Sequence, residues 1–104
     1  MVIFSVIVHK ENLAEKVMHL VLENKYAKSV QLDSEQKNFY DEHGKLEVKQ
    51  TTKLSFLTKA LLYKEIESRL IQEFGDAELV IYSVPISQMN EKYMQQLRSF
   101  IKSI

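Results

Sequence analysis

The sequence contains no cysteine, and this absence removes several classes of function. Disulfide bonds, thiolate metal sites and cysteine nucleophiles are all excluded. The 104 residues also include only two glycines and one proline. Since these two residue types most often interrupt strands and helices, the chain is unusually free of residues that break regular structure.

Long apolar runs are missing as well. The apolar run at the N-terminus covers only residues 2–8, with one serine inside it. A membrane-spanning helix needs about 20 apolar residues, and a signal peptide carries a basic segment before its apolar core. We therefore expect a strand at this position, no membrane partner and a cytoplasmic protein.

Neither sign of charge predominates, because 14 basic side chains balance 14 acidic ones. Nucleic-acid binding rewards a basic surface, so we expect no nucleic-acid partner. Hydrophobic residues make up 45% of the chain, which is enough for one core. We predict a single domain over residues 1–104.

The hydrophobic pattern predicts seven elements in the order β-α-β-β-α-β-α. Asn12 and Asn90 are the expected N-terminal caps of the first and last helices, and Ile104 is expected on the apolar side of the last one. This order predicts an α+β fold, a ferredoxin-like βαββαβ sandwich with an extra C-terminal helix. The expected elements are strands at 2–8, 26–32, 77–84 and for about a dozen residues from Lys45, and helices at 12–25, 59–74 and after Asn90.

A long hairpin is expected between the second and third strands. The segment "DEHG" at residues 41–44 is typical of its turn, since glycine can take a positive φ. The strand after this turn alternates for about a dozen residues, whereas typical strands have about five or six. An arm of this length overruns its own domain and can pair with a neighbouring copy. The interface residues expected on it are Phe39, Tyr40, Gly44, Leu46 and Val48.

The first strand is apolar on both faces, which predicts an oligomer. Val2 and its alternate residues point one way, while Ile3, Ser5 and Ile7 point the other. In a ferredoxin-like fold both helices lie on one face of the sheet, so something else must cover the second face. Another copy of the same chain is the simplest cover.

Three segments resemble the CutA divalent-cation tolerance proteins, in the family's order and spacing. They are "AEKVMHLVLENKYAKSVQL" at 14–32, "FYDEHGKLEVKQTTKLSFLTK" at 39–59 and "SQMNEKYMQQL" at 87–97. The resemblance implies a homotrimer of ferredoxin-like subunits. Their sheets would face inward around a three-fold axis, and the long hairpins would join neighbouring subunits.

The resemblance also implies divalent metal, copper especially, as a possible cofactor. The family's metal chemistry is associated with a Cys, a Glu and a His, and these positions read here as Ser29, Thr51 and Phe74. The lysine at the end of the family's hairpin strand reads as Leu57, although Thr58 is retained. The resemblance therefore implies a divergent member in which metal binding is weak or altered.

Two histidines and a set of hydroxyl-bearing residues are the remaining candidate site residues. His9 and His43 are weak metal candidates, because neither has a partner His or Cys at ligand spacing and a transition metal needs three or four ligands. A surface histidine is the better interpretation of each. The residues that would line a ligand cleft between subunits are Ser29, Tyr40, Thr51, Thr58, Tyr82 and Tyr93. The aromatic ones among them are more typical of residues that pack in the interface than of ligand-binding residues.

The sequence shows no nucleophile–base arrangement and no glycine-rich phosphate loop, so we expect no enzyme activity. The preferred function is a CutA-like trimer related to divalent-cation tolerance. One alternative is a PII-like signalling module that binds a small ligand at subunit clefts and contacts an unknown protein partner. Another is a purely structural assembly module.

Overall fold

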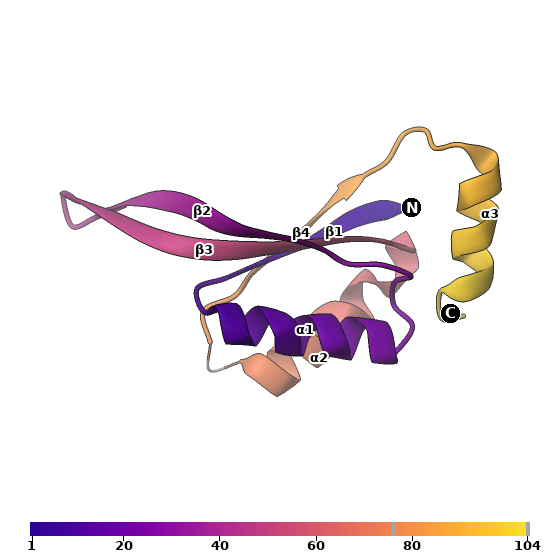
Figure 1. Ribbon diagram of the computed structural model, residues 1–104, viewed down its shortest axis with the longest axis horizontal. Coiled ribbons are helices and arrows are strands. Elements are labelled where there is room, and N and C mark those ends of the chain that lie inside the picture. Colours follow the sequence, from indigo (N-terminus) through magenta and orange to yellow (C-terminus); the bar gives the residue numbers. More distant parts are fainter. Residues whose placement is uncertain (76, 104) are drawn as a thin grey trace.

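The computed structural model describes residues 1–75 and 77–103 and has the α+β architecture that the sequence predicts. All strand pairs are antiparallel, and the sheet order is β2-β3-β1-β4. Helices α1 and α2 lie on one face of the sheet, and α3 stands at the end opposite the hairpin (Figure 1). The elements are β1 (Val2–Val8), α1 (Glu11–Glu23), β2 (Gln31–Glu42), β3 (Lys45–Thr58), a 3₁₀ turn (Ala60–Leu62), α2 (Tyr63–Phe74), β4 (Val80–Pro85) and α3 (Glu91–Phe100).

The core lies between the sheet and the two helices α1 and α2. Phe4 of the central strand β1 is fully buried and stacks on Phe56 of β3, with ring centroids 5.0 Å apart. Each such side chain contributes about 1.5–3 kcal/mol when it is fully buried. The helices supply the opposite wall through residues that are also fully buried: Val17, Val21, Ile66 and Leu70.

The hairpin of β2 and β3 is the longest feature of the molecule and projects from it as an arm (Figure 1). His43 and Gly44 in its turn both have positive φ, 54° and 79°, as the two central residues of a type I′ turn require. The pairing is interrupted between Asp33 and Gln36, where Glu35 has a φ of 67°. This irregularity marks the base of the arm, beyond which the two strands pair without the rest of the sheet.

The second strand begins later than the sequence suggests, at Gln31 rather than residue 26. Tyr26 is 1% exposed because the chain turns inward there, after Lys25 with a positive φ of 57°. The Thr58 hydroxyl donates to the carbonyl oxygen of Tyr26 at 2.7 Å. The apolar residues before β2 are therefore core residues in a connection, not strand residues.

Helix starts also differ from the prediction. Helix α1 begins at Glu11, with Lys10 as the flanking residue, so Asn12 lies inside the first turn and cannot be its cap. Asn90 does precede α3, as expected. The predicted second helix is divided into a 3₁₀ turn and α2. Ile104 lies outside the described residues.

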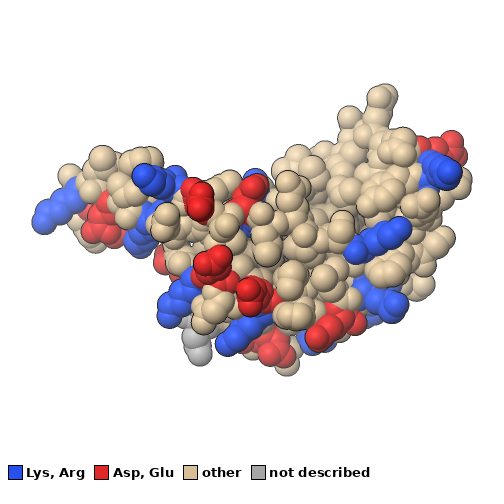
Figure 2. All heavy atoms as spheres, viewed as in Figure 1, with Lys and Arg blue, Asp and Glu red and all other residues tan. Residues whose placement is uncertain are grey.

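The face of the sheet away from α1 and α2 carries exposed apolar side chains. Ile3, Val80 and Val84 are 37%, 45% and 46% exposed there, and the register places Ile3 beside Val84. Figure 2 shows charges of both signs on the hairpin and over the helical layer, and a broad area with few charges where Figure 1 has β4 and the N-terminus. None of the helices in residues 1–75 and 77–103 has the length and apolar character that a membrane crossing requires.

Candidate functional site

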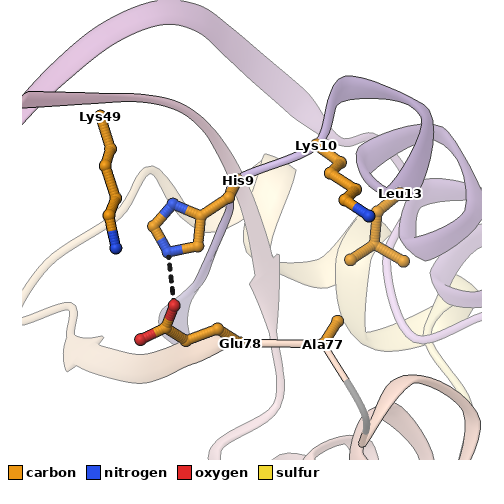
Figure 3. Close-up of a pocket in the computed structure, with 6 residues that line it drawn as sticks. All are labelled: His9, Lys10, Leu13, Lys49, Ala77 and Glu78. Atoms are coloured by element: carbon orange, nitrogen blue, oxygen red, sulfur yellow. Dashed lines mark ion pairs between the residues drawn. The ribbon is translucent and has the colours of Figure 1, made fainter.

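Two hollows meet at His9, where the arm joins the body of the protein. The first, called here the mixed hollow, has a volume of about 560 Å³ and combines apolar walls with charged groups (Figure 3). The second, the polar hollow, has a volume of about 400 Å³. The mixed hollow is lined by His9, Lys10, Leu13, Lys49, Ala77 and Glu78, and the polar hollow by His9, Glu11, Ser34, Glu35, Gln50, Thr51 and Thr52.

His9 directly follows β1 and links the hairpin to the segment before β4. Its Nε2 atom lies 3.4 Å from Oε2 of Glu78, with Lys49 on one side of the ring and Lys10 on the other (Figure 3). The ring centroid is 6.4 Å from that of Tyr40, on β2. Within the described part of the chain, His9 Nδ1 is buried without a hydrogen-bond partner.

Lys49 and Tyr40 face the same region from the two strands of the hairpin. Lys49 Nζ lies 5.2 Å from the centre of the Tyr40 ring and 3.7 Å from Oε1 of Glu42. Asn38 donates to the Tyr40 hydroxyl at 3.3 Å. The predicted cleft residue Tyr40 therefore does lie near His9, in a setting that includes a cation over its ring.

Thr51 is the most buried polar residue of the polar hollow, with 3% exposure. Its hydroxyl oxygen is buried and has no hydrogen-bond partner among the described residues. Glu35 enters the hollow from the irregular part of β2, where its positive φ turns the strand. Bulges are frequent beside functional sites because they re-aim a side chain.

The two metal candidates do not come together. His43 is exposed in the hairpin turn, whereas His9 lies at the base of the arm. Thr51, which lies near His9, is seven residue steps along the chain from Gly44, a distance of about 23 Å along the strand. Residues 1–75 and 77–103 contain no group of three His, Cys, Asp or Glu side chains placed to hold a metal ion.

The three family metal positions are also apart within one chain. Ser29 lines a separate hollow of about 260 Å³ beside Ser55, and Thr51 lies four residues along β3 from Ser55, roughly 13 Å away. Phe74 packs partly buried against the core at the end of α2. No side chain at these three positions has a carboxylate, imidazole or thiolate ligand group.

The remaining predicted cleft residues have different surroundings. The prediction that Thr58 lines a ligand cleft is wrong. Thr58 is fully buried, and its hydroxyl donates a hydrogen bond to the backbone of Tyr26. Tyr82 lies on the open face of the sheet with Lys53 Nζ 5.7 Å from its ring centre, and a hydrogen bond from Lys53 lowers the pKa of Tyr82. Tyr93 lies on α3 with Lys28 Nζ 5.9 Å from its ring centre.

The aliphatic residues and the phenylalanine expected at the interface on the arm are exposed, whereas Tyr40 is half-buried. Phe39 and Val48 lie directly opposite each other on β2 and β3 and are 64% and 53% exposed. Leu46, two residues from Val48 on the same face, is 75% exposed. These three side chains form an apolar patch on the arm, called here the arm patch.

Sequence reasoning missed several lining residues of the two hollows. Glu78 and Lys49 come from segments distant in the sequence, and no spacing rule connects them with His9. The polar stretch "DSE" at residues 33–35 coincides with the irregular part of β2 that brings Glu35 to the polar hollow.

Comparison with known proteins identifies the family of this chain and solved structures that share its fold. The chain matches the family model described as CutA1 divalent ion tolerance protein over residues 2–99. No curated protein matches the chain.

Solved CutA structures share its fold over nearly the whole chain. The D60A variant of CutA1 from Pyrococcus horikoshii OT3 has 22% identity and a TM-score of 0.86, covering 99% of this chain and 100% of that one. CutA1 from Oryza sativa has 16% identity and a TM-score of 0.89, with coverages of 99% and 94%. The protein described as periplasmic divalent cation tolerance protein CutA from Archaeoglobus fulgidus has 17% identity and a TM-score of 0.86, with coverages of 98% and 100%.

These three structures establish the fold alone, since their identities are low, and none of them is described as a PII-like protein. The family assignment depends instead on the family model, which spans residues 2–99 of the 104. This chain therefore belongs to the CutA1 family of divalent ion tolerance proteins.

Proposed function

We propose that this protein acts in divalent-cation tolerance as a homotrimer, and that it binds copper or zinc only weakly at the positions its family uses. The observation that carries the proposal is the set of side chains at those positions. Ser29, Thr51 and Phe74 offer two hydroxyls and a phenyl ring, which are poor ligands for Cu²⁺ and Zn²⁺. A role in tolerance would then involve altered binding or contact with a protein partner.

Association of copies of the chain is supported by two exposed apolar surfaces. One is the open face of the sheet with Ile3 and Val84, and the other is the arm patch. Burying both against copies of the chain would remove apolar surface from water. The role proposed is binding and not catalysis.

A cytoplasmic location is part of the proposal. The Archaeoglobus fulgidus protein, in contrast, is described as periplasmic. No specific observation favours the alternatives of a PII-like signalling module or a purely structural one.

A metal titration that compares this chain with a restored variant tests the proposal. Isothermal titration with Cu²⁺ and with Zn²⁺ should give binding at least about tenfold tighter for Ser29→Cys/Thr51→Glu than for the unchanged protein, because the variant regains a thiolate and a carboxylate that copies of the chain in the proposed trimer can offer to one metal ion. A variant with the same composition, Ser68→Cys/Thr51→Glu, is the control, since Ser68 lies on the exposed face of α2. Tight binding by the unchanged protein would contradict the proposal.

A further inference from the structure

The polar hollow contains two buried polar atoms that lack partners. They are His9 Nδ1 and Thr51 Oγ1, and within the described part of the chain they are the buried side-chain nitrogen and oxygen atoms without a hydrogen bond. Both residues line this hollow. Because buried polar groups are nearly always satisfied in native proteins, each exception needs a physical explanation, such as a bound molecule.

The two atoms belong to residues that adjoin the last pair of β1 and β3. Val8, the last residue of β1, pairs with Thr52 of β3. His9 follows Val8 along the chain, and Thr51 precedes Thr52. Because both side chains line the same hollow, one bound group can reach both of them.

Glu78 lies on the side of the His9 ring away from Nδ1. Its Oε2 atom is 3.4 Å from Nε2. In the neutral tautomer that carries its proton on Nε2, beside this carboxylate, Nδ1 has a lone pair that accepts a hydrogen bond. In that tautomer the unpartnered nitrogen is an acceptor.

The other lining groups are also mainly acceptors. Glu11, in the first turn of α1, and Glu35, at the irregular point of β2, each provide a carboxylate. Gln50 can accept through its carbonyl oxygen, and the Thr51 hydroxyl can accept as well as donate. The two lysines at the arm base line the mixed hollow and not this one. The occupant that satisfies such a lining is a cationic donor.

A compact ammonium group meets these requirements better than a metal ion. Residues 1–75 and 77–103 hold no three His, Cys, Asp or Glu groups positioned around one metal, whereas an ammonium has three N–H donors and needs only hydrogen-bond distance. A volume of about 400 Å³ suits a small molecule. We propose that the polar hollow binds the ammonium group of a small primary amine, held by Thr51, His9 and the carboxylates of Glu11 and Glu35.

This inference goes beyond the proposed function, because it concerns an organic ligand and shares only Thr51 with the family's metal positions. The copper titration and the amine titration are therefore independent, and either can fail alone.

Putrescine is the probe, and 1,4-butanediol is the control that replaces each ammonium with a hydroxyl. Titrations of the full chain followed by ¹H–¹⁵N spectra should show saturable shifts around His9 and Thr51 with putrescine and none with the diol. Glu35→Gln and Thr51→Val should each weaken binding about tenfold. Glu15→Gln removes a charge from an exposed position of α1 outside the hollow and should leave the affinity unchanged.

Folding of the variants is checkable in the same spectra. Thr51→Val removes a hydroxyl that has no partner in the described residues, so we expect the fold to persist. If putrescine gives no saturable shifts, or if the diol binds equally well, the inference is wrong. Unchanged affinity in both Glu35→Gln and Thr51→Val would also overturn it, as would displacement of bound putrescine by stoichiometric Zn²⁺ coordinated at His9.

Discussion

At the scale of single residues, Tyr26 connects three parts of the chain that are distant in the sequence. Its hydroxyl donates to Glu65 on α2 at 2.8 Å, and Thr58 at the end of β3 donates to its carbonyl oxygen. Glu65 also pairs with Lys102 near the C-terminus, whose Nζ lies 5.8 Å from the centre of the Tyr26 ring. The retained Thr58 is therefore explained by packing of the connection before β2 and not by a ligand.

The ionisation of Tyr26 is a prediction at this scale. Burial, and then the hydrogen bond to the Glu65 carboxylate, raises the pKa of Tyr26 from 10.0 to about 12. Because the folded-state pKa is raised, the stabilisation by the protonated phenol is complete below pH 10 and is lost as the pH rises towards about 12. In an ultraviolet titration of phenolate formation, Tyr26→Phe should remove the ionisation step that occurs at the highest pH.

A control variant makes this titration specific. The pKa of Tyr63 is also raised, by burial and by its hydrogen bond to Glu67. Tyr63→Phe should leave the step near pH 12 in place. If that step persists in Tyr26→Phe, the assignment to Tyr26 fails.

At the scale of elements, the hairpin was predictable because its signals are local. The turn residue Gly44 and the alternation after it predict a long strand, and β3 has 14 residues. The start of β2 was not predictable in the same way, since Tyr26 has the β propensity of a strand residue but is drawn into the core by contacts with residues far along the chain. The local sequence pattern therefore predicts the arm, whereas the start of β2 at its base depends on packing between residues that are distant in the sequence.

The candidate site was predictable only in part, for the same reason. His9 was singled out from its residue type, and Thr51 from the family resemblance. Their meeting depends on the pairing of β1 with β3, and the role of Glu78 depends on the segment before β4. Glu35 enters the polar hollow through a bulge, which changes the face of a strand and so defeats simple alternation.

The arm patch gives a prediction for this element. Phe39→Ser/Val48→Ser removes a directly opposed apolar pair that is mostly exposed in the single chain, so the subunit should remain folded. Each side chain contributes about 1.5–3 kcal/mol if a neighbouring copy buries it fully, so association should weaken by at least about tenfold per contact. Sedimentation at several concentrations measures the change.

A matched variant on the opposite face of the arm controls for general damage. Glu47→Gln/Lys49→Gln alters two residues that alternate with the arm patch on β3, and it should change association much less. If both double variants associate like the unchanged protein, the arm patch is not an interface.

At the scale of the whole molecule, one chain leaves apolar surface on two separate regions. The open face of the sheet and the arm patch lie on different parts of a body that measures 48 × 28 × 21 Å. A chain of 104 residues buries only about two-thirds of the surface that it exposes when unfolded, so its stability alone is marginal. Association that covers both regions adds stability, which makes the melting temperature depend on protein concentration.

The mass in solution tests this expectation directly. Light scattering behind size-exclusion chromatography should give about 37 kDa, three times the 12.2 kDa subunit, at micromolar concentration. The apolar open face argues for association, whereas the number of three subunits comes from the family resemblance. A stable dimer would therefore agree with the argument for association and contradict the expected number of subunits. A 12.2 kDa species would contradict both. In that case the exposed Ile3, Val80 and Val84 would have to be covered by a different protein, and the search for function would move from the clefts between copies to that partner.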